Sequence, residues 1–268
     1  MEEDSRSGAV PALPLMRGFR VGTTSYVYPD AIVPNVERLA GRVEDVELVL
    51  FESGGVDALP DPAAIERLAA LQARHGHSYT VHFAIDRAIG SGDPGEREAF
   101  LVHARRAIER TRPLRPFAFI LHLAGIDAGA RPREVDAWRA RAGAGIERLL
   151  EAGAAPERLA VENTEAPFEW SEPLVERYGL SVCLDVGHVW LHGEPVETVI
   201  PGRLPRTRVV HLHGERDGRD HLSLAAMDRE RLRAALALLR GFTGVLTIEV
   251  FSYEETASSI RCLGELLG

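Results

Sequence analysis

The stretch from Ser181 to His188, SVCLDVGH, is a short apolar run that ends in a carboxylate and an imidazole. The chain repeats this pattern at fairly even intervals, and its other apolar runs end at Glu52, His82, His122, Glu162, at His211 with His213, and at Glu249. Burying a carboxylate or an imidazole at the end of a strand costs free energy unless another group pairs with it. The repeated endings therefore suggest one shared partner, and a metal cluster is the natural candidate.

The apolar runs predict strands that alternate with helices. The expected strands are Arg20–Ser25, Val46–Glu52, Tyr79–Phe83, Ala118–Leu123, Leu159–Glu162, Val182–Asp185, Val209–His213 and Val245–Val250. Helical spacing of apolar residues predicts helices over Pro62–His75, Glu96–Arg110, Arg133–Gly153, Glu169–Tyr178 and Asp228–Leu239, with a short helix plus loop in Gly193–Pro205. The pairs His75-Gly76 and Tyr178-Gly179 are typical of helix C-terminal stops.

This alternation predicts a (β/α)8 TIM barrel of the α/β class. Strands that return once every 25 to 40 residues or so indicate a parallel sheet, and about eight such units match a TIM barrel. A doubly wound sheet would also alternate, but Gly22-Thr23-Thr24-Ser25 shows no Gly-x-Gly-x-x-Gly pattern after the first strand. We expect a single TIM-barrel domain over residues 18–268. Residues 1–17 begin acidic and lack the basic and apolar regions of a signal peptide, so we expect a disordered tail there.

Strand parity supports the barrel, because successive side chains of a strand point to opposite faces. In the last strand, Leu246 and Ile248 share one face, and Glu249 lies on the other. The bulky face should pack under the outer helices, and the face with the polar ending should point into the barrel. All polar endings then lie at the carboxyl ends of strands, where barrel enzymes build their active sites. In the second strand Glu47 and Glu52 have opposite parity, and we favour Glu52 for the site because it ends the strand.

The composition excludes several classes of function. The formal net charge of -9 argues against a nucleic-acid partner. All 31 basic residues are arginine, which excludes Schiff-base and pyridoxal-phosphate chemistry because both need a lysine amine. Cys183 and Cys262 are too few for a disulfide framework or a cysteine-based zinc site, and they favour a reducing, cytoplasmic setting. No run approaches about 18 apolar residues, so we expect no membrane span.

The inward polar endings predict a centre for divalent metal ions. Imidazole and carboxylate ligands without thiolate suit Zn, Mn, Fe or Co. Roughly three to four ligands serve one ion, whereas seven to nine can hold two or three, so we expect between one and three ions. The candidate ligands are His82, His122, Glu162, Asp185, His188, His211, His213 and Glu249.

Each candidate also has a structural explanation. A lone strand histidine is more often a hydrogen-bonded core residue than a ligand, and an acid can form a salt bridge to one of the many arginines. That explanation does not account for the shared parity and strand-end position of Glu162, Asp185 and Glu249. Asp185-Val186-Gly187-His188 is the strongest motif, because the acid ends the strand, the glycine allows a sharp turn and the histidine returns over the site. Four histidines are left out as turn, loop or solvated helix residues: His75, His77, His103 and His192.

Loop residues add candidates for contacts with substrate. Arg216 and Arg219 follow the seventh strand and could clamp a phosphate or carboxylate bidentately, the alternative being a solvated charged loop. His221 could be a further metal ligand or a proton donor to a leaving group. Thr164, Glu165 and Glu215 are candidates for orienting the ligands.

Several of these motifs together resemble a known superfamily. They are Glu162-Asn163, Asp185-x-Gly187-His188, His211-x-His213 with the later Asp220-His221, and Glu249. Nearly the whole chain from about Arg20 resembles the xylose-isomerase-like, or AP endonuclease family 2, TIM barrels, which include metal-dependent abasic-site endonucleases, sugar isomerases and ketose epimerases.

The resemblance implies two different ligand sets. Likeness to the endonucleases implies three zinc ions, with the histidines of strands three and four falling on His82 and His122. Likeness to the epimerases implies one metal ion, held by Glu162, Asp185, Glu249 and one of the two strand-seven histidines. The endonuclease alignment favours His211 and the epimerase alignment favours His213, so the choice stays open.

A second set of segments carries a narrower resemblance. It comprises Val21–Tyr26, Pro34–Val36, Val46–Ser53, Tyr79–His82, Ser181–His188, His211–Gly214 and Asp220–Leu224. These segments resemble the bacterial cobamide-remodelling phosphodiesterases, which are implied to cleave the phosphodiester in the nucleotide loop of B12-type corrinoids. One departure is Phe83-Ala84, where a Pro-Leu pair is expected after His82.

Our first hypothesis is therefore a metal-dependent hydrolase, a phosphodiesterase acting on cobamides. The expected catalytic residues are Glu162, Glu249, His188 and His221, and His188 or His221 assists the leaving oxygen. A sugar isomerase or epimerase with one metal ion is the second hypothesis, and an abasic-site endonuclease the third. A non-catalytic corrinoid or metal-binding module is a further alternative. The expected partner is a small molecule, a corrinoid or a sugar phosphate, contacted by Glu52, Arg216 and Arg219.

Overall fold

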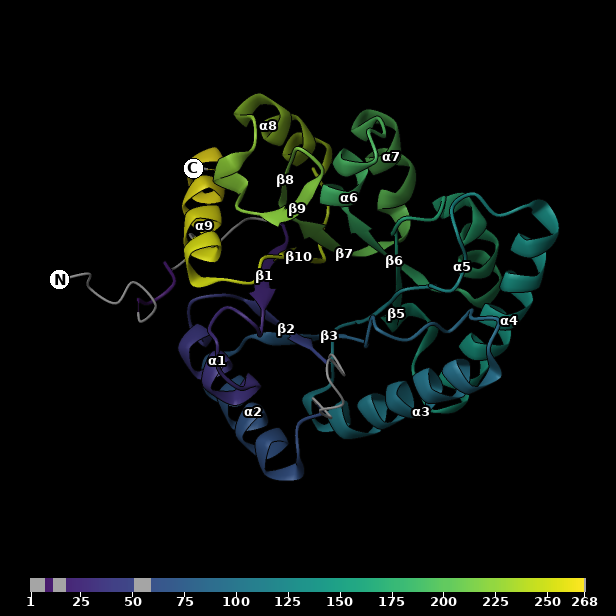
Figure 1. Cartoon of the computed structure of the whole chain (residues 1–268). Helices are drawn as coiled ribbons and strands as arrows, with labels where there is room; N and C mark the ends of the chain where they lie inside the picture. The colour runs from purple at the N-terminus through teal and green to yellow at the C-terminus, as the bar shows by residue number, and fades with distance from the viewer. Residues whose placement is uncertain (1–7, 12–17, 51–58, 268) are drawn as a thin grey trace.

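The computed structural model describes residues 8–11, 18–50 and 59–267, and eight of its strands close into a barrel (Figure 1). Around the barrel the strands follow the order β1-β10-β7-β6-β5-β4-β3-β2, and all of these pairings are parallel. The strands are β1 Arg20–Thr24, β2 Asp45–Val49, β3 Ser78–His82, β4 Phe119–Leu121, β5 Leu159–Glu162, β6 Ser181–Asp185, β7 Thr207–Leu212 and β10 Val245–Ile248. The predicted TIM barrel is confirmed.

Helices form the outer layer around the barrel (Figure 1). They are α1 Ile32–Leu39, α2 Pro62–His75, α3 Pro94–Thr111, α4 Pro132–Glu151, α5 Glu172–Tyr178, α6 Val186–Leu191, α7 Val196–Arg203, α8 Arg229–Leu238 and α9 Tyr253–Leu267. The prediction for α2 is confirmed at both ends. The predicted helix Glu169–Tyr178 is divided, because a 3-10 turn over Phe168–Trp170 precedes α5.

Local sequence signals explain where two of these helices begin and end. The Asp61 carboxylate accepts the Ala64 N–H at the start of α2, and the following proline favours the first helical position. Gly76 ends α2 with a φ of 76°, and Gly179 ends α5 with a φ of 65°. Both are the left-handed stops predicted from the sequence.

The side chains of the barrel strands divide into two layers. Outward residues such as Leu48, Val81 and Leu246 pack beneath the helices. A separate cluster fills the barrel interior and consists of Ala118, Ile120, Ala160, Cys183, Val209 and Val245. The alternation of the two sets confirms the predicted parity. Elsewhere the interior is polar, with Asp45, Glu47, Thr80 and Thr247 all buried.

Several expectations need correction. The barrel strands β2 and β10 end earlier than predicted, at Val49 and Ile248, and Glu52 lies outside the described residues. His103 is only 2% exposed, so the expectation of a solvated histidine is wrong, because it lies on the face of α3 that packs inward. A short antiparallel hairpin, β8 Gly214–Arg216 with β9 Arg219–Leu222, follows β7 and was not predicted, since it is charged and lacks apolar alternation.

Most of the predicted tail lies outside the described residues. The described stretch 8–11 packs against the loops that precede and follow α1. The Tyr28 hydroxyl donates to the Gly8 carbonyl at 2.9 Å, the Arg42 guanidinium donates to the Val10 carbonyl at 2.9 Å, and the Val10 side chain is buried. Within the described part of the chain, no helix combines the length and apolar character needed to cross a membrane.

Candidate metal centre

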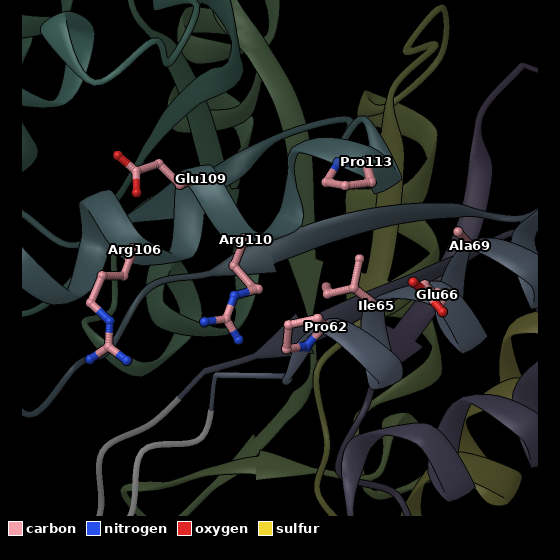
Figure 2. Close-up of a pocket in the computed structure, with 8 residues that line it drawn as sticks. All are labelled: Pro62, Ile65, Glu66, Ala69, Arg106, Glu109, Arg110 and Pro113. Carbon is pink, nitrogen blue, oxygen red and sulfur yellow. The ribbon is translucent and has the colours of Figure 1, made fainter.

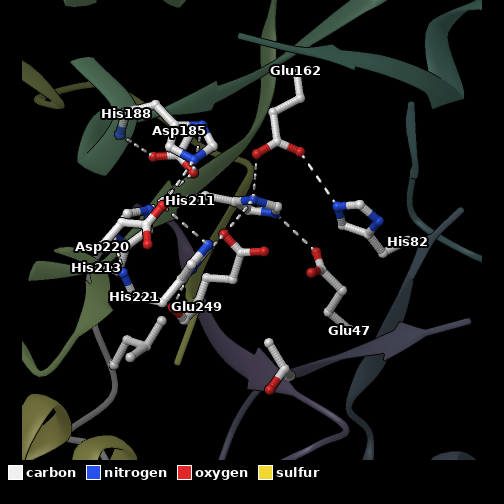
Figure 3. A network of polar contacts seen from close by, with 12 residues as sticks. Glu47, His82, Glu162, Asp185, His188, His211, His213, Asp220, His221 and Glu249 are labelled. Carbon is white, nitrogen blue, oxygen red and sulfur yellow. Dashed lines mark hydrogen bonds and ion pairs between the residues drawn. The ribbon is translucent and has the colours of Figure 1, made fainter. Parts of the chain in front are cut away.

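The polar endings of the strands meet at one rim of the barrel (Figure 3). Because the barrel strands are all parallel, their carboxyl ends lie on the same side. His82, Glu162 and Asp185 are the last residues of β3, β5 and β6. The candidate ligands form three neighbouring groups, and within each group the ligand atoms lie within 4.8 Å of one another.

The first group joins β3, β4 and β5. The Nε2 atoms of His82 and His122 lie 3.4 and 2.9 Å from Glu162 Oε2. The opposite ring nitrogen of His82, Nδ1, donates to the Phe83 carbonyl at 2.8 Å. This bond orients His82 so that its Nε2 faces the Glu162 carboxylate.

The second group lies at the centre and consists of Glu162, Asp185, His211 and Glu249. Nδ1 of His211 lies 3.2 Å from Glu162 Oε1 and 3.1 Å from Glu249 Oε2. All four side chains are buried. Three carboxylates and one imidazole around one point form a complete donor set for a divalent ion.

The third group lies at the mouth and consists of His188, His213 and His221. Nε2 of His213 lies 3.2 Å from Asp185 Oδ2, which connects this group to the second. Oδ2 of Asp220 lies 3.9 Å from His188 Nε2 and 3.8 Å from His221 Nε2. The side chains of His188 and His221 are 14% and 28% exposed, so both reach solvent at the mouth of the barrel.

The turn from β6 into α6 positions the second and third groups together. Oδ1 of Asp185 accepts the His188 N–H at 2.7 Å and so caps α6. The Asn163 side chain bonds the Asp185 N–H and carbonyl, each at 2.9 Å. A Cβ on Gly187 would lie 2.1 Å from Cε1 of His213. Glycine is needed here for close contact with that ring, a reason that the motif alone did not show.

Charges within the cluster stabilise one another. Burial opposes the charge on His82 and His213, but contacts with Glu162 and Asp185 respectively raise the pKa of each imidazole to about 9. Burial likewise opposes the charge on Glu162, yet His211 and His122 hold the pKa of this carboxyl well below its usual value. In the metal-free protein, protons on the histidines therefore balance the buried carboxylates.

The chemistry of the cluster fits divalent metal ions. Among the described residues, the ion-pair partners of Glu162, Asp185 and Glu249 are histidines, so arginine salt bridges do not explain these acids. Cys183 also lies near Glu162 and His211. Burial raises the pKa of the Cys183 thiol well above its usual value, so the thiol keeps its proton in the metal-free protein.

The remaining candidates surround the centre or fall outside it. Arg216 and Arg219 pair across the β8–β9 hairpin and are both exposed, and Arg216 donates to the Ala226 carbonyl. Their contact with substrate stays a prediction. Glu215 forms an ion pair with Arg231 at 3.0 Å, so its carboxylate is engaged outside the cluster. Glu165 is exposed and Thr164 half-buried beyond β5. Glu52 lies outside the described residues.

Sequence reasoning set aside one residue that the structure places in the site. Glu47 Oε2 lies 2.9 Å from His211 Nε2, and the Glu47 side chain is fully buried. The strand β2 ends at Val49, before the expected end at Glu52. Glu47 is the acid of this strand that faces inward and contacts His211. The available signal was its parity, which it shares with the inward Asp45.

A groove on the outer helical layer is separate from this centre. It lies between α2 and α3 and is lined by residues such as Ile65, Arg106 and Arg110 (Figure 2). None of the candidate ligands lines it.

Comparisons with known proteins agree with the fold. Residues 41–266 match the family described as xylose isomerase-like TIM barrel. No curated protein is significantly similar to the chain. Among solved structures, a D-tagatose 3-epimerase-like protein is 20% identical with a TM-score of 0.74, over 93% of this chain and 97% of that one.

Two further structures have the same architecture. Endonuclease IV from Thermus thermophilus is 22% identical with a TM-score of 0.71, over 92% of this chain and 98% of that one. An L-ribulose 3-epimerase is 18% identical with a TM-score of 0.69, over 93% and 94% of the two chains. At these identities the likeness supports the fold alone.

Proposed function

We propose that this chain, which belongs to the xylose isomerase-like TIM barrel family, is a metal-dependent phosphodiesterase whose centre holds more than one divalent ion. The observation that carries the proposal is the surplus of linked donors. Glu162 belongs to both the first and the second group. Asp185 joins the second group to the third through its 3.2 Å contact with His213.

A single ion would bind only some of the donor groups in this cluster. A zinc ion takes about four ligands, and the second group alone supplies that number. His82 and His122 on one side, and the three histidines at the mouth on the other, are then additional donors. Their contacts with Glu162 and Asp185 favour neighbouring ions that share these two carboxylates.

The residues of the chain have distinct tasks in this proposal. Divalent ions in such a cluster supply Lewis acidity toward a phosphoryl group and an activated water. The first and second groups would hold them. His188 Nδ1 donates to the Asn163 carbonyl at 2.9 Å, which leaves Nε2 on the Asp220 side at the mouth. In this proposal His188, or its neighbour His221, would protonate the leaving oxygen from there. If a third ion is present, both histidines act as ligands instead.

We propose the nucleotide-loop phosphodiester of B12-type corrinoids as the substrate. The support is the set of sequence segments that resemble cobamide-remodelling phosphodiesterases, among them Tyr79–His82 and Ser181–His188, which carry candidate ligands. In the reaction the oxygen of water bonds to phosphorus, the bond from phosphorus to the nucleoside oxygen breaks, and that oxygen takes up a proton. The products are a corrinoid phosphate and the lower-ligand nucleoside.

The test separates the reaction class from the substrate. The protein, loaded in turn with Zn, Mn, Fe or Co, is incubated with adenosylcobalamin and with bis-(p-nitrophenyl) phosphate, and the products are followed by mass spectrometry and absorbance. Release of a corrinoid phosphate supports the full proposal. Cleavage of the synthetic diester alone would overturn the substrate, and no cleavage of either with any metal would overturn the reaction class. Glu249→Gln, which removes a charge and keeps the shape, should be inactive.

A sugar epimerase is the second candidate, and the solved structures favour it. Two of the three structures described above are a sugar 3-epimerase and an epimerase-like protein. The second group by itself is a complete one-ion site, and Glu162 and Glu249, which both contact Nδ1 of His211, would be the pair of proton-exchanging acids. One ion per chain together with epimerisation of a ketose would support this candidate. Two or more ions with diester cleavage would support the first.

A further inference from the structure

Glu47 is a buried carboxylate to which the proposed chemistry assigns no task. Its Oε2 lies 2.9 Å from Nε2 of His211, and both side chains are fully buried. The other ring nitrogen, Nδ1, faces the carboxylates of Glu162 and Glu249 at 3.2 and 3.1 Å. The His211 ring is thus held with one edge on Glu47 and the other on the second group (Figure 3).

We propose that Glu47 is a positioning residue, which accepts the N–H of His211 Nε2 and thereby keeps Nδ1 directed at the metal centre with its lone pair free. A neutral imidazole carries one N–H, and the group that accepts it decides which nitrogen can bind a metal ion. A carboxylate acceptor also makes the opposite nitrogen a stronger ligand. This inference rests on the metal centre of the proposed function and is independent of the substrate.

A purely structural role for Glu47 explains the observations less well. Burying a carboxylate is costly, and other inward positions of the barrel are filled by Ile120, Val209 and Val245, which carry no such cost. Oε1 of Glu47 has no hydrogen-bond partner among the described residues. A residue selected for stability alone would be apolar here, whereas a residue that orients His211 must carry an acceptor.

The same strand provides a matched control. Asp45 lies two residues before Glu47 on the same inward face of β2 and is also fully buried. Its carboxylate accepts a hydrogen bond from the Ser78 hydroxyl, outside the metal centre. Glu47→Gln and Asp45→Asn are therefore the same chemical change, made on one strand and in one environment, and only the first alters a group that contacts His211.

The experiment measures metal affinity on the full chain by competition with a chromophoric chelator, for Zn and Mn. We expect Glu47→Gln to bind metal about 10-fold more weakly and Glu47→Ala up to about 100-fold more weakly, since glutamine can still accept the N–H but carries no charge. Asp45→Asn should bind as the wild type does. Thermal melting of each metal-free variant establishes that it is folded, and if Glu47→Ala does not fold, Glu47→Gln decides the result.

Two results would overturn the inference. One is wild-type affinity in Glu47→Gln, and the other is an equal loss of affinity in Asp45→Asn, which would show a general effect of the barrel interior. Failure of the phosphodiesterase proposal is distinguishable from either. A wild-type protein that cleaves no phosphodiester, while Glu47→Gln still weakens metal binding, overturns that proposal and leaves the role of Glu47 supported.

Discussion

Substituting Gly187 by alanine tests whether the His213 ring is a metal ligand. A Cβ at this position would lie 2.1, 2.3 and 2.4 Å from the Cε1, Nε2 and Nδ1 atoms of His213. Ordinary van der Waals contact begins at 3.4 Å. The ring must therefore retreat by about 1.3 Å, because the helix backbone that carries the new methyl group is capped by Asp185 and cannot move independently.

This displacement of the His213 ring should lower the stability of the protein and weaken its binding of metal. It would break the 3.2 Å contact from His213 Nε2 to Asp185 and the 3.0 Å hydrogen bond from the His221 N–H to His213 Nδ1. Overpacking of this kind costs about 1–3 kcal/mol. Ligand distances in metal sites vary by only about 0.2 Å, so a ring displaced by about 1.3 Å no longer binds the ion. We expect Gly187→Ala to lose an ion per chain, or to bind it about 10- to 100-fold more weakly.

Metal content after dialysis, measured by mass spectrometry, and melting curves with and without added metal check this prediction. The matched control is Gly202→Ala in α7, because nothing lies within 4 Å of a Cβ built there. It should keep the wild-type metal content and melt at the same temperature or higher, since alanine favours a helix by about 1 kcal/mol over glycine. Wild-type metal content and affinity in Gly187→Ala would refute the assignment of His213 as a ligand.

Four further predictions follow from the same geometry. Removing metal with a chelator should leave the chain folded but lower its melting temperature, since an ion at about 1,000 times its Kd stabilises by about 4 kcal/mol; calorimetry that finds no shift would argue against a resident ion. In the metal-free protein, the pKa of His82 and His213 is raised from 6.5 to about 9, so their contribution to stability is complete below pH 6.5 and lost as the pH rises through 9. Urea unfolding of the apo-protein at pH 6 and pH 10 should show that loss, and equal stabilities would contradict it. Burial raises the pKa of Asp45 from 3.8 to about 7, so stability should fall as the pH rises from about 4 to 7. Urea unfolding across that pH range should show the fall, and Asp45→Asn should remove up to ~4 kcal/mol of it. Asn163→Ala removes both hydrogen bonds to the Asp185 main chain. It should lower the free energy of unfolding by about 1–3 kcal/mol and weaken metal binding. A change in neither quantity would show that these two hydrogen bonds do not position Asp185.

The barrel, and the rim at which its polar residues meet, could be predicted from the amino-acid sequence. Alternation along each strand is a local property, so it separates inward residues such as Ile120 and Val209 from outward ones such as Leu121 and Val210 without knowledge of the neighbours. The polar endings marked the carboxyl ends of parallel strands, which share one rim. The hairpin β8–β9 and the packing of residues 8–11 escaped prediction, because both depend on contacts with distant segments rather than on periodicity.

The partner that each side chain contacts depends on the three-dimensional fold and could not be predicted. His211 and His213 share one face of the chain, and parity cannot separate them. The closed barrel brings His211 between Glu47, Glu162 and Glu249, whereas it brings His213 to Asp185 and Gly187. Glu47 contacts the centre for the same reason, since its partner comes from a strand 164 residues away in the sequence. Spacing along a strand fixes the face on which a residue lies, but the tilt and closure of the barrel fix which strands face one another across its interior.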